Sequence, residues 1–264
     1  MTHPAYGQLR RVTPGAAVLL CDNPSVMTLD GTNTWILRVS GSEQCVVVDP
    51  GPDDEAHLRR VAEIGEVVAT LLTHGHVDHA AGAKRFAELT GSSVRAVDPA
   101  HRLGSEGLIE GEVIAAAGVE IRVLATPGHT ADSVCMVLDG DGEHGSVLTG
   151  DTVLGRGTTV IAPPDGALGP YLDSLRLLAE LSDGTAVLPG HGPELPDAPA
   201  AARQYLAHRE QRLAQVRAAL VRLGADATAR QVVEVVYADV DQALWPAAEW
   251  SVRAQLRFVR ESGR

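Results

Sequence analysis

The stretch that decides the fold is LLTHGHVDHAAG, residues 71–82, in which polar residues follow directly on an aliphatic run. Residues 67–72 have the composition of a buried strand, so the polar side chains are expected where that strand ends. Imidazole and carboxylate are donors that zinc and other divalent first-row metals accept. Four candidate ligands, His74, His76, Asp78 and His79, are too many for one tetrahedral ion with an open catalytic position. The stretch therefore predicts two ions.

Three later segments repeat the pattern of an aliphatic strand followed by a polar turn. They are VLATPGHTADS with His129, SVLTGDTVLG with Asp151 and AVLPGHGPE with His191. Glycine stands beside each of them, as expected where the backbone bends tightly to aim a side chain into a shared cavity. The candidate ligands are thus five histidines and two aspartates. The remaining histidines lack this context and are expected at the surface: His3, His57, His101, His144 and His208.

Composition limits the class of protein. The chain has 264 residues, 45% of them hydrophobic, and a net charge of -12, which discourages tight binding to polyanions. Residues 201–264 differ from the rest because they hold 10 arginines against 7 acidic residues. No apolar run approaches the roughly 20 residues of a membrane span, and the N-terminus has no signal-peptide pattern, so a cytoplasmic protein without a membrane partner is expected. Three cysteines without a C-x-x-C pair predict buried thiols rather than disulfides.

The order of elements predicts a layered α/β domain with a mixed sheet. Short aliphatic strands alternate with helices expected over 56–64, 80–89 and 171–181. After the proline-rich segment at 192–200 the pattern becomes helical, over 201–223, from the capping-box spacing of Thr228 and Gln231 onwards, and over 248–261 after a break at Pro246. We therefore expect a catalytic domain at 1–199 and a small all-helical domain at 200–264.

The string H-x-H-x-D-H at 74–79, followed in order by His129, Asp151 and His191, resembles the metallo-β-lactamase superfamily. The resemblance implies an αββα sandwich with a dinuclear metal site at one edge of its two sheets. It also implies the ligands of each ion. The first ion would be bound by His74, His76 and His129, the second by Asp78, His79 and His191, and Asp151 would bridge both.

The variant of the motif narrows the resemblance. Zinc-dependent β-lactamases commonly have a cysteine at the position of Asp151, so hydrolysis of β-lactam antibiotics is not expected. Flavodiiron relatives, which reduce oxygen, usually have an acid at the position of His76, so this activity is not expected either. The full set looks like the glyoxalase II and nuclease branches. GTNTWIL at 31–37, GDTVLGRGTTV at 150–160 and HREQRL at 208–213 further resemble the group around β-lactamase-like protein 2. That group ends in a winged-helix-like domain, and its animal members are metal-dependent endoribonucleases on single-stranded RNA. The chain ends at Arg264, soon after its last helix, so no β-hairpin wing is expected.

Two divalent cations would lower the pKa of a shared water, so that a metal-bridging hydroxide attacks the substrate. Asp78 is the candidate for orienting this hydroxide. Asp49 either holds a histidine ligand in the correct tautomer or caps the turn before Pro50. The segment GRGTT at 155–159 either offers Arg156, Thr158 and Thr159 to a substrate anion or forms a simple turn. Nitrogen and oxygen ligands favour zinc and leave manganese and iron open.

Three functions remain open, and so does the oligomeric state. Cleavage of single-stranded RNA follows from the resemblance and from Arg253, Arg257 and Arg260, whose spacing places them on one helix face, although such a face is also typical of solvated surface. Hydrolysis of a small thioester or ester suits the acidic catalytic domain, and only 39 residues between Asp151 and His191 leave no room for the inserted domain of several RNA-processing relatives. A metal-dependent oxygenase or a binding module with an idle site is the third, and the intact ligand set argues against idleness.

Overall fold

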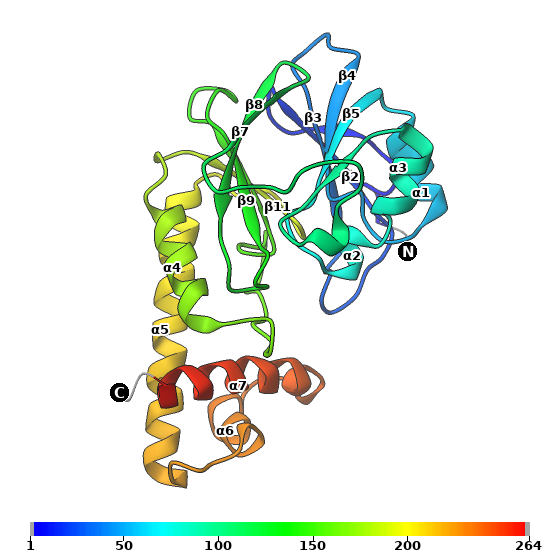
Figure 1. The fold of residues 1–264 in the computed structure, drawn as a ribbon. Helices are drawn as coiled ribbons and strands as arrows, with labels where there is room; N and C mark the ends of the chain where they lie inside the picture. Colours follow the sequence, from blue (N-terminus) through cyan, green and yellow to red (C-terminus); the bar gives the residue numbers. More distant parts are fainter. Residues whose placement is uncertain (1–2, 262–264) are drawn as a thin grey trace.

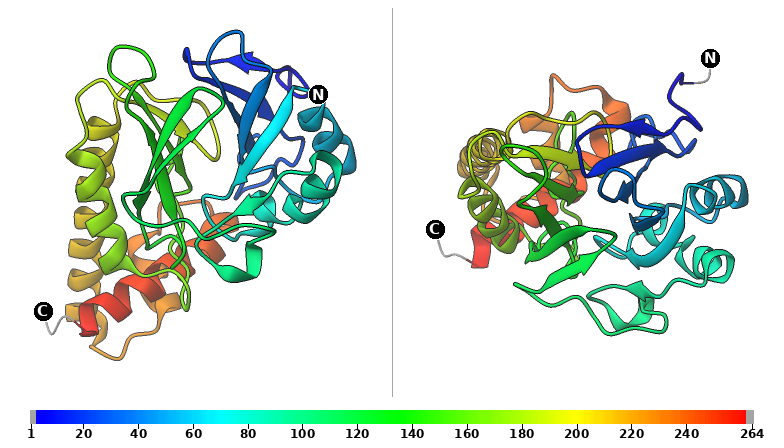
Figure 2. Two further views of the ribbon diagram at one scale, coloured as in Figure 1. Left: turned by 45° about the horizontal axis from the view of Figure 1, so that its top comes forward. Right: turned by 90° about the horizontal axis from the view of Figure 1, so that it is seen from above.

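Two β-sheets face each other at the centre of the molecule, and helices cover their outer faces (Figure 1). The structure is a computed structural model that describes residues 3–261. The first sheet has six strands in the order β1-β2-β3-β4-β5-β6, and the second has five in the order β11-β10-β9-β8-β7. The views in Figure 2 show the same layers from two further directions. The αββα sandwich implied by the resemblance is confirmed.

The strands are short, and four of the eleven in residues 3–261 are buried along their whole length. Those of the first sheet are β1 (Arg10–Arg11), β2 (Ala16–Leu20), β3 (Asn33–Leu37), β4 (Gln44–Val48), β5 (Glu66–Leu71) and β6 (Val94–Arg95). Those of the second are β7 (Val113–Ala116), β8 (Val119–Ala125), β9 (Val134–Leu138), β10 (Ser146–Gly150) and β11 (Ala186–Pro189). Neighbouring strands are antiparallel, except that β4 with β5, β5 with β6 and β10 with β11 are parallel pairs.

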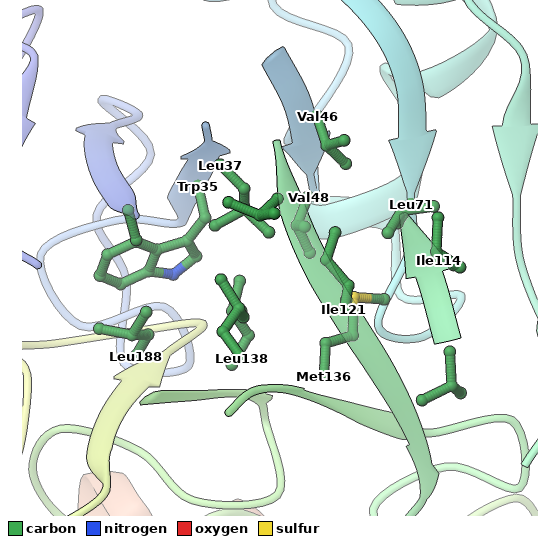
Figure 3. Close-up of a cluster of buried hydrophobic side chains, with 14 of the residues drawn as sticks. Trp35, Leu37, Val46, Val48, Leu71, Ile114, Ile121, Met136, Leu138 and Leu188 are labelled. Atoms are coloured by element: carbon green, nitrogen blue, oxygen red, sulfur yellow. The ribbon is translucent and has the colours of Figure 1, made fainter. Parts of the chain in front are cut away.

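Burial on both faces explains the continuous aliphatic runs in the sequence. Successive side chains of a strand point to opposite faces. Val46 and Val48 of β4 therefore enter the core between the sheets, which Figure 3 shows, whereas Cys45 and Val47 pack under the helices of the first sheet. The central core takes Trp35 from the first sheet and Met136 from the second.

Each outer face is covered by two main helices. On the first sheet they are α1 (Glu55–Ala62) and α3 (Ala83–Thr90), preceded by the short α2 (Val77–Ala80). On the second they are α4 (Leu168–Ala179) and the first half of α5 (Ala198–Leu223). Single 3-10 turns occur at Pro99–His101 and Gln242–Leu244.

The helix predicted over 80–89 is divided in two, so that prediction was wrong at its start. The chain breaks at Gly82, whose amide donates to the carbonyl of Gly51 at 3.0 Å instead of continuing helix α2. A side chain at this position would lie 2.5 Å from the carbonyl oxygen of Pro52. Glycine is required there because the two backbones approach so closely.

The C-terminal part packs its own core from the second half of α5, α6 (Ala229–Val236) and α7 (Trp245–Glu261). The predicted capping box is present, with Thr228 and Gln231 each bonding the other's backbone. The predicted break at Pro246 was wrong, because Pro246 is the second residue of α7, where the missing N–H would have no helical partner. Between Thr228 and Glu261 the structure shows helices and no strand.

Helix α5 belongs to both cores. Ala202 and Tyr205 pack against α4 and the second sheet, and Val216 and Ala219 pack against α6 and α7. The predicted domain division at residue 200 therefore falls in the first turn of one continuous helix, which Figure 1 shows running from the sheet to α6 and α7.

Two other expectations concern the cysteines and membrane-spanning helices. Cys21, Cys45 and Cys135 are buried and unpaired, as predicted. Among residues 3–261 no helix has the length and apolar character needed to cross a bilayer.

Candidate metal centre

The predicted ligands meet because the strands that carry them end at the same edge of the sandwich. β4 and β5 run parallel in the first sheet, and β10 and β11 run parallel in the second. Backbone contacts close this edge, with the amide of Val134 donating to the carbonyl of Thr73 at 2.9 Å and a bridge joining Thr32 to His191. The residues that follow β5, β8, β10 and β11 therefore come together between the two sheets.

One group of donors consists of His74, His76, His129 and Asp151. Nδ1 of His76 lies 3.1 Å from Nε2 of His74 and 3.0 Å from Nε2 of His129. A tetrahedral zinc ion with Zn–N bonds of about 2.0–2.1 Å would hold its nitrogens about 3.3 Å apart. The three imidazoles thus have nearly the spacing of ligands to one ion.

A second group consists of Asp78, His79 and His191. The two histidine Nε2 atoms are 3.2 Å apart, and Oδ2 of Asp78 is 3.1 Å from Nε2 of His191 and 3.4 Å from Nε2 of His79. Asp78 and His79 are adjacent residues of the short helix α2, and both side chains reach His191 from it.

Asp151 lies between the two groups. Its Oδ2 is 3.6 Å from Nε2 of His129, and its Oδ1 is 3.4 Å from Nε2 of His191 and 3.5 Å from that of His79. Oδ1 is buried and has no hydrogen-bond partner in the described part of the chain. The structure therefore brings all seven predicted ligands together, with one carboxylate oxygen turned to each group.

Hydrogen bonds behind three histidines fix their tautomers. Nδ1 of His129 lies 2.9 Å from the carbonyl of Val160, and Nδ1 of His191 lies 3.0 Å from that of Gly31. Nδ1 of His79 lies 2.8 Å from Oδ2 of Asp49. Carbonyl and carboxylate oxygens only accept, so each Nδ1 carries the hydrogen and each Nε2 turns a lone pair to the centre.

Asp49 also fixes His74, through Thr73. The Thr73 hydroxyl donates to Oδ2 of Asp49 at 2.6 Å and therefore accepts from Nδ1 of His74 at 3.0 Å. Asp49 further accepts the amide hydrogen of Thr73 at 2.8 Å, and its own φ of 52° lies in the left-handed region. The Asp49 carboxylate is thus directed at the histidines, in agreement with the alternative that it holds a histidine ligand in the correct tautomer.

The donor set fits a pair of cations. Lone pairs of neutral imidazoles that face each other at about 3 Å repel unless a positive charge lies between them. Burial lowers the pKa of His79, but Asp151 and Asp49 outweigh burial and hold this pKa well above its usual value. Burial also lowers the pKa of His191, but Asp151 outweighs burial and raises this pKa to about 9. In the protein without ions, protons on these two rings would stand in for metal.

The acids are correspondingly easy to ionise. Burial raises the pKa of Asp151, but the neighbouring His191 and His79 outweigh it and hold the pKa well below its usual value. Burial also raises the pKa of Asp78, and hydrogen bonds from His191 and His79 reverse that shift, so this pKa too lies far below normal. Both side chains are carboxylates, which is the form that binds a metal.

The predicted substrate residues lie in the segment 155–159. The Thr159 hydroxyl is 3.0 Å from Nδ1 of His129 and so supports a ligand. Arg156 forms a bidentate ion pair with Asp30, at 2.6 and 2.9 Å. Thr158 is exposed, and all three residues line one cavity beside the metal centre.

This cavity has a volume of about 440 Å³ and reaches from Asp151 and His129 to the C-terminal helices. Sequence reasoning missed the residues of α5 that line it, His208, Arg209 and Arg212. They belong to the string HREQRL, which resembles the group around β-lactamase-like protein 2 but does not by itself indicate a cavity. His208 was expected at the surface, yet its Nδ1 is buried.

The expectation that His57 lies at the surface was also wrong. This side chain is buried on the inner face of α1, and its Nε2 lies 2.9 Å from the Thr34 hydroxyl.

The arginines of α7 that were considered as a face for RNA are engaged by residues of the C-terminal part of the chain. Arg253 pairs with Glu249 at 3.1 Å, Arg257 pairs with Glu261 at 2.7 Å, and Arg260 donates to two backbone carbonyls.

Comparison with known families matches both parts of the chain. The family model described as "Metallo-beta-lactamase superfamily" matches residues 27–191, and the one described as "Beta-lactamase associated winged helix domain" matches residues 228–264.

Individual relatives extend over most of the chain. A "Beta-lactamase-like protein 2 homolog" of Drosophila melanogaster is 32% identical over 275 residues, which cover 96% of this chain and 90% of the relative. An "Atrochrysone carboxyl ACP thioesterase" of Aspergillus chevalieri is 33% identical over 227 residues, 82% of this chain and 69% of the relative. A crystal structure of a beta-lactamase domain protein from Burkholderia ambifaria has a TM-score of 0.80 at 23% identity, and the match covers 99% of this chain and 90% of that one.

Proposed function

Because this chain belongs to the metallo-beta-lactamase superfamily of metal-dependent hydrolases, we propose that it is a dinuclear-metal hydrolase that cleaves a small thioester or ester. The observation that carries the proposal is the position of the seven donors, which converge on both sides of Asp151 at the end of a cavity of about 440 Å³. Pockets of roughly 300–1,000 Å³ are typical of sites for small molecules.

His74, His76 and His129 would hold one ion, Asp78, His79 and His191 the other, and Asp151 both. Nitrogen and oxygen donors at this spacing favour zinc, and manganese or iron would accept the same set. When bound, such ions supply a lowered pKa of water and polarisation of the substrate carbonyl.

The protein's own contribution is positioning and proton transfer. Asp78 is the more exposed of the two carboxylates, with 23% of its side chain accessible against 11% for Asp151. It is therefore the acid that reaches a substrate water, orients it and accepts its proton in a hydrogen bond. Asp49 and Thr73 keep the rings of His74 and His79 in one orientation meanwhile.

The walls of the cavity favour an ester over a polymer. Apolar side chains, among them Leu29, Leu154, Val160 and Leu244, form much of the lining. Similarity to a protein described as an acyl carrier protein thioesterase supports the same class of reaction.

Single-stranded RNA is a second candidate substrate. Nearly the whole chain matches a beta-lactamase-like protein 2 homolog. The resemblance to that group implies cleavage of single-stranded RNA, and this supports RNA as a substrate. The ion pairs of Arg253 and Arg257 with glutamates argue against α7 as a face for RNA, since each pair would have to open to receive a phosphate.

One set of assays separates the two candidates. Protein loaded with zinc or manganese is offered a panel of acyl thioesters, with release of free thiol as the readout, and an end-labelled single-stranded RNA. Asp78→Ala serves as the inactive variant, and Asp183→Ala, an acid whose side chain is 87% exposed, is the matched control. Thiol release that is lost only in Asp78→Ala supports the proposal. RNA cleavage with intact thioesters selects the second candidate, and the absence of both activities contradicts a hydrolase of either kind.

A further inference from the structure

The cavity beside the metal centre is built by both parts of the chain. One wall holds Asp151 and His129, and a second is formed by the loop that contains Val26, Met27 and Leu29. Helix α5 forms the third wall and the C-terminal domain the fourth, the latter through Tyr237, Val240, Leu244, Ala247, Ala248 and Ser251. A substrate held at the metal centre would therefore extend toward the C-terminal helices.

Helix α5 contributes a cluster of basic side chains to this cavity. Arg209 is only 3% exposed, donates to the carbonyl of Thr159 and lies over the ring of Tyr171, with 5.2 Å between guanidinium carbon and ring centre. Its Nε is buried and has no hydrogen-bond partner among the residues that the structure describes. Within residues 3–261 no carboxylate forms an ion pair with it.

Arg212 lies one helical turn further along the same cavity wall. Nη1 donates to Oε1 of Gln215 at 2.9 Å, and the guanidinium lies 4.6 Å above the ring centre of Tyr237. In the described part of the chain it too lacks an acidic partner, unlike Arg156, which Asp30 neutralises. Stacking on an aromatic ring leaves the remaining N–H groups of a guanidinium free to bind a planar anion.

His208 completes the cluster. Its Nδ1 is buried and finds no hydrogen-bond partner within residues 3–261. Burial, then Arg209 and Arg212, lower the pKa of this imidazole. His208 is therefore neutral at pH 7 and can donate or accept one hydrogen bond without adding charge.

Charge in the cavity is thus opposite to that of the protein as a whole. The chain carries a net charge of -12, yet among residues 3–261 the only acid that lines the cavity is Asp151, whose oxygens are turned to the histidines. Arg209 is buried and Arg212 half-buried, and in the described part of the chain neither has an acidic partner, which is costly for a charge withdrawn from water and points to an anion that neutralises it when bound.

We infer that the cavity binds an acyl group that ends in an anion, such as a carboxylate or phosphate, held by Arg212 and His208. The apolar lining then contacts the carbon skeleton between this anion and the scissile carbonyl. The inference rests on the proposed hydrolase function and adds the chemical class of the acyl group to it. A guanidinium binds either anion through two parallel hydrogen bonds, so both belong to the same chemistry.

The test compares three thioesters of equal chain length on the zinc-loaded protein. One ends in a carboxylate, one in a phosphonate and one in a neutral methyl ester. At least one anionic thioester is expected to be cleaved with a kcat/KM about 10- to 100-fold above that of the neutral one, the range of a charge-assisted hydrogen-bond pair. Which anion is preferred identifies its source as a carboxylic acid or a phosphate ester.

Arg212→Gln is expected to remove most of this preference, because it keeps the hydrogen-bonding polarity and deletes the charge. Arg217→Gln changes an exposed arginine of the same helix outside the cavity and should leave the preference as it is. His208→Gln provides a second variant, for which a smaller loss is expected. Equal rates on all three thioesters, or a preference that survives in Arg212→Gln, would overturn the inference while the hydrolase proposal stands.

Binding is measured separately so that a failed assay remains informative. Calorimetric titration with adipate and with an alkyl phosphonate of the same length should show affinity about 10-fold or more weaker in Arg212→Gln than in Arg217→Gln. If no thioester is cleaved, the hydrolase proposal fails on its own, and this titration alone decides the anion site. Equal affinity of the two variants would overturn that site.

Discussion

Oδ2 of Asp49 lies 2.8 Å from Nδ1 of His79, and both side chains are almost completely buried. The same oxygen accepts the hydroxyl of Thr73, which in turn accepts from His74. His74 and His79 belong to different groups of donors, so one carboxylate orients a ligand in each half of the centre.

Asp49→Asn should weaken metal binding by about 10- to 100-fold, as is usual when a partner behind a metal-binding histidine is lost. The side-chain amide has one acceptor oxygen in place of two, so it cannot accept from the backbone N–H of Thr73 and also from the Thr73 hydroxyl and His79, and the rings of His74 and His79 are no longer fixed. Affinity is measured by competition with a chelating indicator. Asp183→Asn at the surface is the control, and unchanged affinity in Asp49→Asn would refute this role.

Removal of the ions with a chelator should lower the melting temperature, because a ligand that binds only the folded state stabilises it. At a free ion concentration of 1,000 Kd the stabilisation is about 4 kcal/mol. Thermal unfolding is followed before chelation, after it and after zinc is returned. A melting temperature that is the same in all three states would mean that the seven donors hold no structural cation.

His57 should make the protein less stable in acid. Burial lowers its folded-state pKa from 6.5 to about 4, although Asp54 raises it slightly. Between these values the unfolded chain binds a proton that the folded chain does not, so stability is complete above pH 6.5 and falls as the pH drops toward 4. The loss is roughly 3 kcal/mol.

The measurement is urea unfolding of the wild type and of His57→Gln at several pH values across this window. Contributions from the metal-centre histidines cancel in the comparison because the variant leaves them intact. Parallel curves for the two proteins would assign the acid sensitivity elsewhere.

Arg209→Met should affect stability and metal binding together. It removes the hydrogen bond to the carbonyl of Thr159, and Thr159 supports His129. A hydrogen bond from a charged group contributes about 1.5–3 kcal/mol, so a loss of that size in the free energy of unfolding is expected. Metal affinity separates support of the centre from general stability, and Arg217→Met is the control on the same helix.

Thr228→Ala should destabilise the C-terminal core by about 1 kcal/mol, because the backbone N–H of Gln231 loses the Thr228 hydroxyl that caps it, while the bond from the backbone N–H of residue 228 to Gln231 remains. Thr228→Ser keeps the hydroxyl and should be close to wild type in urea unfolding. Equal destabilisation by the two changes would show that packing of the threonine methyl matters more than the cap.

The ligands were predictable because their signal is local. Each follows a strand with a recognisable aliphatic run, and parallel strands bring such ends to one edge. The layers were predictable for a related reason, since segments such as β4 are apolar on both faces only when each face is covered.

Features that depend on distant contacts could not be predicted. His57 lies between Ala56 and Leu58 behind the acidic residues at 53–55, and the sequence does not show that Thr34 of β3 approaches its ring. Gly82 ends a helix because the backbone of residues 51–52 lies against it. The basic lining of the cavity required knowing that α5 passes beside the metal centre, which no periodicity within α5 reveals.

The continuity of α5 has a mechanical consequence. A helix of 26 residues is about 39 Å long, and this one is clamped by side-chain packing at both ends. Relative rotation of the two cores would bend it within the segment that carries Arg209 and Arg212. The helix therefore resists changes in the width of the cavity, and we expect ligands to be selected by the size and charge that fit a preset opening rather than by a closing movement.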